Sequence, residues 1–284
     1  LSPQTGLSEP ASLSGQLSAL RDASGLLSID EVAAPAKAGE FAALPGFLSA
    51  GYITDTYWLR FTLQRTPDAS EHWFLEVGLP FLDGVTLYAP RSAVGDSLKS
   101  AVGEAQQFNA IHLGDRQPYA ERPVPHRYFV FPVEFADAEP VTFYLRIKTT
   151  STMLVRVFVA QYAGLLVRAQ VDTALYAIYF GVIALGVLAN LVFWYWLRAH
   201  VYLSYSFYLT MLGALMFANG GFAAQWLFPH RPLTADQMVG VMVGLTYLSG
   251  FAFFIEVLHL REHFPRYSRV MDAILIFYAA CGLA

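Results

Sequence analysis

The sequence is poor in charge, and its few charged residues are spread unevenly. Only 14% of the 284 residues are charged, whereas about a quarter would be usual for a water-soluble protein. Hydrophobic residues make up 55%, and the mean hydropathy is +0.42. This composition excludes an ordinary soluble protein and indicates a membrane protein. All three lysines, Lys37, Lys99 and Lys148, lie in the first half, so we expect two halves with different surroundings.

Cysteine is nearly missing, and lysine is missing from the second half. Cys281 is the only cysteine and lies in an apolar stretch, so the first half has no disulfide and depends on its own core. No lysine follows Lys148, which excludes a retinal Schiff base in the apolar segments identified below. The net charge of −4, with both signs scattered, argues against a nucleic-acid-binding surface.

Long stretches without charge predict membrane-spanning helices at residues 174–197, 201–222 and 237–257. At about 1.5 Å per residue the first covers about 36 Å, enough for a hydrocarbon core of about 30 Å. Residues 163–173 are expected to form a juxtamembrane linker. A fourth span begins after Asp272 and is incomplete, so residues 174–284 are expected to be a helical bundle truncated in its fourth helix, and the sequence to be a fragment.

The positions of the arginines predict which side of the membrane each part occupies. Arg198 follows the first span, three arginines lie between the third and fourth spans, and the remaining loop carries only Arg231. Short cytoplasmic loops are enriched in arginine and lysine. We therefore expect residues 198–200 and 259–269 to be cytoplasmic and the N-terminal half to lie outside the cytoplasm.

Residues 30–162 are predicted to form an all-β, jelly-roll-like sandwich. Hydrophobic residues alternate with polar ones from Tyr57 to Val159, as in "YWLRFTLQR", and turn-rich segments such as "ADAEP" separate the strands. No helical period intervenes, which favours antiparallel sheets. Residues 1–29 are expected to be coil or cover, and a short helix is expected near Ile29 to Ala34.

Two signals in the apolar half could carry chemistry. "HLREH", from His259 to His263, matches a zinc-peptidase pattern, but no third ligand follows it and the end of a span is an ordinary place for histidine. Asn190 is predicted to make a hydrogen bond between helices rather than to form an ion path. Gly240 and Gly244 fit a small-xxx-small helix-packing motif. No catalytic residue or metal ligand is therefore assigned.

The candidate ligand-binding residues lie in the sandwich. Trp58 and Arg60 share the face opposite Leu59, and "ERPVPHRYF" supplies Arg122, His126 and Arg127 just before another strand. Aromatic faces with arginine forks suit sugars, carboxylates or amino acids. The alternative is structural: Trp58 packs in a core, and the arginines pair with Glu76, Asp83 or Glu121.

Several segments in order resemble a known family of bacterial receptors. They are "YWLRFTL", "LEVGLPFLDGVTLY", "HRYFVFPVEF", "FYLRIKTTSTM" and "YFGVIALGVLANLVFWYWLRAHVYLSYSFYL". The sequence resembles the seven-transmembrane receptors with diverse intracellular signalling modules (7TMR-DISM) that carry a type 2 extracellular domain. The resemblance covers residues 30–284, and its membrane signature includes Asn190, Arg198 and Tyr205.

The resemblance implies a bacterial inner-membrane receptor with a periplasmic sensor. Such sensors look like carbohydrate-binding modules, and their helices signal in cis to a cytoplasmic histidine kinase, diguanylate cyclase or phosphatase. Trp58, Arg60, Arg122, His126 and Arg127 match recurring sensor positions of the family, and Asp83 matches an acidic strand position.

Some members respond to calcium, and in this sequence a calcium site would rest on Asp83 alone, whereas calcium takes six to eight oxygens. No cofactor is assigned, and calcium at Asp83 stays an open alternative. The expected partners are a small periplasmic ligand, the lipid bilayer and a second copy of the chain. The fragment itself is expected not to be an enzyme. The alternative function is a transporter or a zinc-type membrane peptidase with a β-sandwich cap.

Overall fold

The computed structural model describes residues 1–90 and 108–259. The chain forms two compact units, Leu1–Val171 and Asp172–Ala284.

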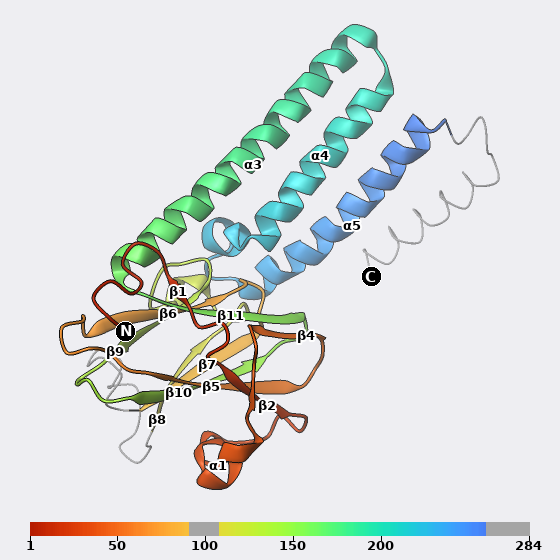
Figure 1. Cartoon of the computed structure of the whole chain (residues 1–284). Helices are drawn as coiled ribbons and strands as arrows, with labels where there is room; N and C mark the ends of the chain where they lie inside the picture. Colours follow the sequence, from red (N-terminus) through yellow and green to blue (C-terminus); the bar gives the residue numbers. More distant parts are fainter. Residues whose placement is uncertain (91–107, 260–284) are drawn as a thin grey trace. The chain divides into compact units, whose positions relative to one another are not determined.

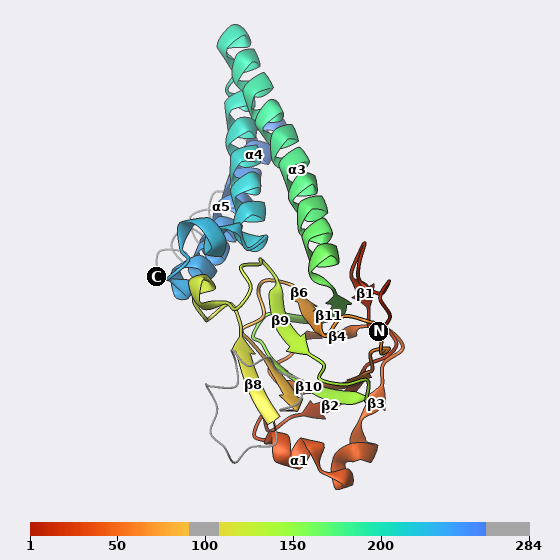
Figure 2. The ribbon, with the colours of Figure 1, turned by 90° about the vertical axis from the view of Figure 1, so that its left-hand side faces the viewer.

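The first unit is a sandwich of two antiparallel sheets, as predicted (Figures 1 and 2). One sheet pairs in the order β1-β11-β6-β9, and β4 also pairs with β11. The other has the order β3-β2-β5-β10-β7-β8. The strands of the first sheet are β1 (Ala11–Ser12), β4 (Leu48–Tyr52), β6 (His72–Gly78), β9 (Phe129–Glu134) and β11 (Thr152–Ala160). Those of the second are β2 (Ser18–Asp22), β3 (Ala42–Ala43), β5 (Thr56–Leu63), β7 (Gly84–Pro90), β8 (Phe108–Leu113) and β10 (Val141–Lys148).

The core between the sheets follows from the alternation of apolar residues. Along β5, Leu59 and Phe61 are buried in this core, whereas Trp58 belongs to a separate cluster on the other face. Phe143 lies opposite Phe61 on β10, and the two rings stack with centroids 5.6 Å apart. Each such buried aromatic or aliphatic side chain contributes about 1.5–3 kcal/mol of burial free energy. No disulfide is needed to hold the two sheets together.

Residues 1–29 differ from the expectation of coil or cover. β1 pairs with β11, and β2 pairs with β5 along residues 18–22. Leu13 and Leu17 are buried in the main core. β2 does not alternate, because Ala19 is buried in the main core and the adjacent Leu20 in the cluster on the other face. Pairing with the edges of longer strands supplies the order.

The short helix expected near Ile29 is present as α1 (Ile29–Ala33), and η1 (Pro35–Glu40) follows it. Ser28 caps α1: its side chain accepts from the Glu31 N–H, and the Glu31 carboxylate accepts from the Ser28 N–H. α1 lies beside the six-stranded sheet in Figures 1 and 2, and Val32 packs against Trp58 in the cluster on that face. The capped turn therefore covers part of the outer face of the sheet.

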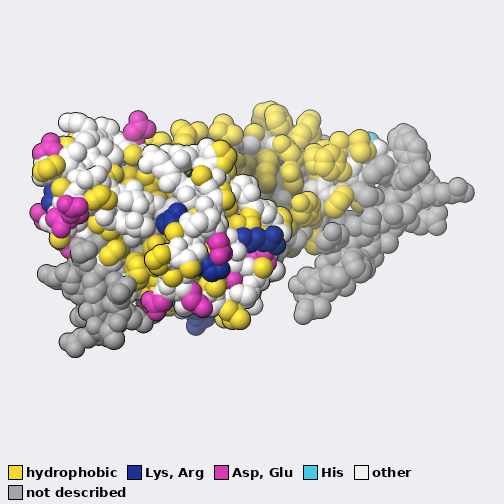
Figure 3. Space-filling view, turned by 60° about the horizontal axis from the view of Figure 1, so that its bottom comes forward, with side chains coloured by type: hydrophobic (Ala, Val, Ile, Leu, Met, Phe, Trp, Pro, Cys, Tyr) yellow, Lys and Arg dark blue, Asp and Glu magenta, His cyan; other side chains and the backbone are white. Residues whose placement is uncertain are grey.

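Within the described residues, three helices are long and apolar enough to cross a membrane: α3 (Tyr162–Leu197), α4 (His200–Asn219) and α5 (Pro232–Val257). Residues 163–173, expected to be a linker, instead form the first turns of α3. A π-helical turn, η4 (Ala223–Leu227), follows α4. In Figure 3 the charged side chains gather over the sandwich, whereas the helix surface in view is mostly hydrophobic.

Contacts within and between these helices bear on two expectations. The Asn190 side-chain amide donates to the Gly186 carbonyl of its own helix at 2.8 Å, so its hydrogen bond is within a helix rather than between helices. No described residue lies within 4 Å of a Cβ added at Gly240 or Gly244. Close helix contacts occur instead at Gly250, where an added Cβ would lie 3.2 Å from Tyr208. Within residues 1–90 and 108–259 nothing packs on Gly240 or Gly244, so their packing against a helix stays a prediction.

Other predictions fall beyond the described part of the chain. Leu260–His263 of the "HLREH" motif and the fourth span lie outside the described residues. Glu256, at the end of α5, accepts a hydrogen bond from the Ser204 hydroxyl of α4. This bond joins two helices near the end that we expect to be cytoplasmic.

We expect residues 1–171 to fold as a soluble, β-rich unit, and residues 30–171 to aggregate. The shorter piece lacks β1 and β2, so it loses three buried leucines worth about 1.5–3 kcal/mol each and leaves the edge of β5 unpaired. Circular dichroism and size-exclusion chromatography of the two pieces check this. Equal solubility and equal melting temperature of both pieces would contradict the role given to the N-terminal strands.

Candidate functional site

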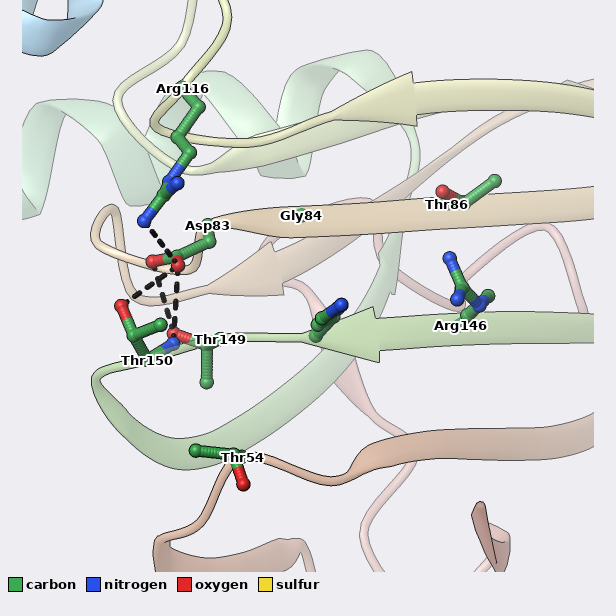
Figure 4. A pocket seen from close by; sticks show the side chains of 9 residues that line it. Thr54, Asp83, Gly84, Thr86, Arg116, Arg146, Thr149 and Thr150 are labelled. Carbon is green, nitrogen blue, oxygen red and sulfur yellow. Dashed lines mark hydrogen bonds and ion pairs between the residues drawn. The ribbon is translucent and has the colours of Figure 1, made fainter. Parts of the chain in front are cut away.

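A pocket of about 500 Å³ opens on the face of the six-stranded sheet that points away from the sandwich core. Its volume lies in the usual range for small-molecule sites. It lies where β7 begins and β10 ends (Figure 4). The lining residues are Thr54, Asp83, Gly84, Thr86, Arg116, Arg146, Lys148, Thr149 and Thr150.

The strand pattern explains why cations line this pocket. Leu145 and Ile147 on β10 are buried in the core. Arg146 lies between them and Lys148 follows, so both face the opposite side of the sheet. Arg146 pairs in register with Thr86 on β7, and Figure 4 shows these two side chains on neighbouring strands. The sheet thus presents two cations and a hydroxyl on one surface.

Asp83 joins three chain segments at one end of the pocket. Its carboxylate lies 3.0 Å from the guanidinium of Arg116 and accepts hydrogen bonds from the Thr150 N–H at 3.2 Å and hydroxyl at 2.9 Å (Figure 4). The loop after β8 approaches so closely that a Cβ at Gly114 would lie 2.2 Å from the Asp83 carbonyl oxygen. Asp83 therefore orders the rim of the pocket, and Arg116 compensates its charge.

This arrangement does not fit calcium. Asp83 is the one carboxylate among the lining residues, it is already paired with Arg116, and Arg146 and Lys148 share the pocket. A calcium ion takes six to eight oxygens and would be repelled by three cations. Within residues 1–90 and 108–259 no group of three or more His, Cys, Asp or Glu side chains is placed to hold a metal ion.

Arg146 is held from two sides. Its guanidinium donates to the Gly25 carbonyl at 2.9 Å, and its central carbon lies 5.9 Å from the centroid of the Trp58 ring. Its Nε is buried and has no hydrogen-bond partner among the described residues. The hydroxyl of Thr86 beside it lies 2.9 Å from His112 Nδ1. Arg146 is therefore positioned in advance and retains hydrogen-bonding capacity.

Trp58 does not line the pocket. It is fully buried, stacks on Tyr88 with ring centroids 5.4 Å apart, and packs with Leu20, Val32 and Tyr144. Trp58 thus faces away from the main core, as predicted, but α1 covers it. Its part in the site is to support the Arg146 guanidinium.

Arg60 also lies outside the lining residues. Its guanidinium lies over the ring of Phe41, 4.5 Å from the centroid. Among residues 1–90 and 108–259 no ion pair involves Arg60. The interaction is a cation–π contact at the edge of the covered cluster.

A tight loop after β2 holds Gly25 against Arg146. The carboxylate of Asp22, which is 3% exposed, accepts from the Ser24 hydroxyl at 2.6 Å and from the N–H groups of Gly25 at 2.8 Å and Leu27 at 3.1 Å. Burial alone would raise the pKa of Asp22, but the hydrogen bonds from Ser24, Leu27 and Gly25 bring it below its ordinary value. The ionised carboxylate therefore fixes the loop.

Arg122, His126 and Arg127 form a separate structural cluster before β9. The Arg122 guanidinium donates to the carbonyls of His126 at 2.9 Å and Arg127 at 3.0 Å and lies 4.8 Å from the Phe129 ring centroid. Burial lowers its pKa to about 10. The guanidinium of Arg127 lies 5.6 Å from the Tyr128 ring centroid, and the His126 ring also contacts Tyr128. These side chains organise their own loop and do not line the pocket.

Of the six predicted ligand-binding residues, only Asp83 lies in the pocket. Sequence reasoning missed Arg116, Arg146, Lys148 and Thr150. Arg146 and Lys148 could have been found, because alternation within "VTFYLRIK" places them on one face. Arg116 and Thr150 lie in loops, where no period indicates direction.

Comparison with known families agrees with this architecture. The model of the 7TMR-DISM extracellular 2 domain matches residues 14–161. The model of the 7TM diverse intracellular signalling region matches residues 172–284. No curated protein matches the sequence.

We expect Asp22→Asn to destabilise the sandwich by about 1–3 kcal/mol at neutral pH, because three donors lose an ionised acceptor. The folded pKa of Asp22 is lowered, so its stabilisation is present above the unfolded value of about 3.9 and is lost as pH falls through the folded value. The gap in unfolding free energy between wild type and variant should therefore close below about pH 4.

Denaturant unfolding of the full chain in detergent, followed by tryptophan fluorescence across pH 3–7, measures this gap. Asp137→Asn, at an exposed position, is the matched control. If the difference in unfolding free energy between wild type and Asp22→Asn stays constant across this pH range, the carboxylate charge does not fix the loop.

Proposed function

Because the chain belongs to the seven-transmembrane receptors with diverse intracellular signalling modules, we propose that its sandwich binds a small ligand and that its helices transmit the binding event. The chain is a membrane receptor with an N-terminal extracellular sensor domain. The family assignment favours this function over the alternative of a transporter or a zinc-type peptidase. The pocket beside Asp83 and Arg146 supports a ligand of small-molecule size.

We further propose the surroundings in which this receptor acts. It lies in a bacterial inner membrane, with the sandwich in the periplasm, and its ligand is carbohydrate-like, a carboxylate or an amino acid. The described chain catalyses no reaction itself. It acts in cis on a cytoplasmic histidine kinase, diguanylate cyclase or phosphatase, and as a homodimer.

The observation that carries the proposal is an ion pair between the sandwich and the first turns of α3. Arg168 on α3 lies 3.0 Å from the carboxylate of Glu76 on β6, and the Glu76 side chain is completely buried. The Arg168 guanidinium also lies 4.1 Å from the centroid of the Phe158 ring on β11. Because α3 runs without a break from Tyr162 to Leu197, a shift of β6 or β11 acts directly on a membrane helix.

Close backbone packing strengthens this attachment. A Cβ at Gly164 would lie 2.2 Å from the Gly6 carbonyl oxygen, so only glycine fits there. That carbonyl accepts a hydrogen bond from the Gln161 N–H at 2.9 Å. Leu165, the next residue, is buried with Val130 and Ala160. The start of α3 is thus part of the sandwich rather than a flexible tether.

We expect Arg168→Gln to separate binding from transmission. A ligand found by thermal-shift screening of sugars, hydroxy acids and amino acids should change the distance between spin labels at Leu197→Cys and Val257→Cys in the wild-type chain, with Cys281→Ala as background. Arg168→Gln should still bind it but show little change, because the buried Glu76 carboxylate loses the ion pair that ties β6 to α3, at a cost of about 3–5 kcal/mol.

Arg156→Gln, at an exposed arginine of β11, is the matched control and should behave as wild type. Double electron–electron resonance in nanodiscs measures the label distances. An unchanged ligand response in Arg168→Gln would remove the role assigned to the ion pair. No distance change in the wild type with any bound ligand would contradict transmission through these helices.

The orientation is tested with single cysteines at Ala199 and at His230, an exposed position in the loop between α4 and α5, again with Cys281→Ala. Arg198 beside Ala199 predicts that this turn is cytoplasmic. An impermeant maleimide applied to spheroplasts should label position 230 strongly and position 199 weakly. The opposite ratio would show that the helices are inverted.

A further inference from the structure

Resting on the proposed function, we infer that the pocket beside Asp83 binds a small carboxylate that also carries hydroxyl groups, such as a hydroxy acid or a sugar acid. The inference selects one ligand class from the three that the receptor proposal allows. It depends on the charge and hydrogen-bonding groups of the nine lining residues.

The charge in the pocket favours an anion. Arg116 is paired with Asp83, whereas no ion pair within residues 1–90 and 108–259 involves Arg146 or Lys148. These two cations are two residues apart on one strand and point to the same side, so their Cα atoms are about 6–7 Å apart. A carboxylate between them would be attracted by both.

The geometry of Arg146 favours a carboxylate in particular. The Gly25 carbonyl and the Trp58 ring hold the guanidinium in place, so little rotamer freedom is lost on binding. A guanidinium presents parallel N–H groups that match the two oxygens of a carboxylate. Lys148, which is exposed, adds a mobile point charge at the pocket rim.

The remaining groups favour hydroxyls on the ligand. The hydroxyl oxygens of Thr86 and Thr150 can each accept a hydrogen bond in addition to the contacts they already make. The nine lining residues include no aromatic side chain, so a neutral sugar ring has no flat surface on which to rest its C–H face. An amino acid is disfavoured because Asp83, the one acid available for its ammonium group, is occupied by Arg116 and Thr150.

The test is isothermal titration calorimetry on the full chain in detergent with malate, tartrate, gluconate and galacturonate. Succinate, which lacks the hydroxyl of malate, and galactose, which lacks the carboxylate of galacturonate, are the matched controls. We expect at least one hydroxy acid to bind at least about tenfold more tightly than its control, the scale of one charge-assisted hydrogen bond. Inorganic phosphate should bind more weakly than that hydroxy acid.

Lys148→Gln should weaken the affinity for the hydroxy acid by about fivefold to tenfold. The melting temperature should not change, because Lys148 is exposed. Lys37→Gln removes the same charge beside Glu40, outside the pocket, and should leave affinity unchanged. Arg146→Gln should weaken binding further. Its effect on folding is followed by the same measurement of melting temperature.

Three results would overturn the inference: binding of none of the four acids, tighter binding of phosphate, or binding that is insensitive to Lys148→Gln. If galactose binds with the same affinity as galacturonate, the proposed ligand class is wrong but the receptor proposal stands. The spin-label experiment tests that proposal with any bound ligand, so the two failures are distinguishable.

Discussion

Each residue of a β-strand faces one side of its sheet or the other, and in β10 this constraint places the core and the pocket back to back. Phe143, Leu145 and Ile147 fill the space between the sheets. Arg146 and Lys148 must then face outward. A one-residue slip of β10 against β5 and β7 would bury both cations and expose the core residues, so the burial that stabilises the sandwich also fixes the pocket.

The outer face of the six-stranded sheet is divided into a covered and an open part. α1 and the segment after it cover Trp58 and Tyr144, while Arg146 and Lys148 stay accessible at the other end. The Asp22 loop lies at the boundary, because its Gly25 carbonyl holds Arg146, whose guanidinium contacts the covered Trp58. Stability of the covered part and geometry of the open part are therefore linked.

Much of this fold could be predicted from the sequence, because long strands and apolar helices carry strong periodic signals. The two-sheet sandwich, the short helix after Ser28 and three long apolar helices were predicted. β1 and β2 were not, since short alanine- and serine-rich strands form only where longer strands pair with them. The sequence predicts a linker at the start of α3 because Arg168 and Asp172 interrupt the apolar run. In the structure Arg168 forms an ion pair with the buried Glu76, so this charge fits within the helix. The pocket was predicted only at Asp83, because the cover over Trp58 and the approach of Arg116 depend on contacts distant in sequence.

The pocket and the start of α3 belong to opposite sheets, yet β11 connects them covalently. Thr149 and Thr150 line the pocket, and the strand that begins at Thr152 ends at Ala160, just before α3. Phe158 near its end contacts Arg168, and residues 156–160 pair with β6, which carries Glu76. Because sandwich interiors are close-packed, β11 cannot absorb a displacement by local collapse. In the proposed receptor, a ligand that draws Thr150 and Asp83 toward Arg146 would therefore act on a strand whose far end is bound to the first membrane helix.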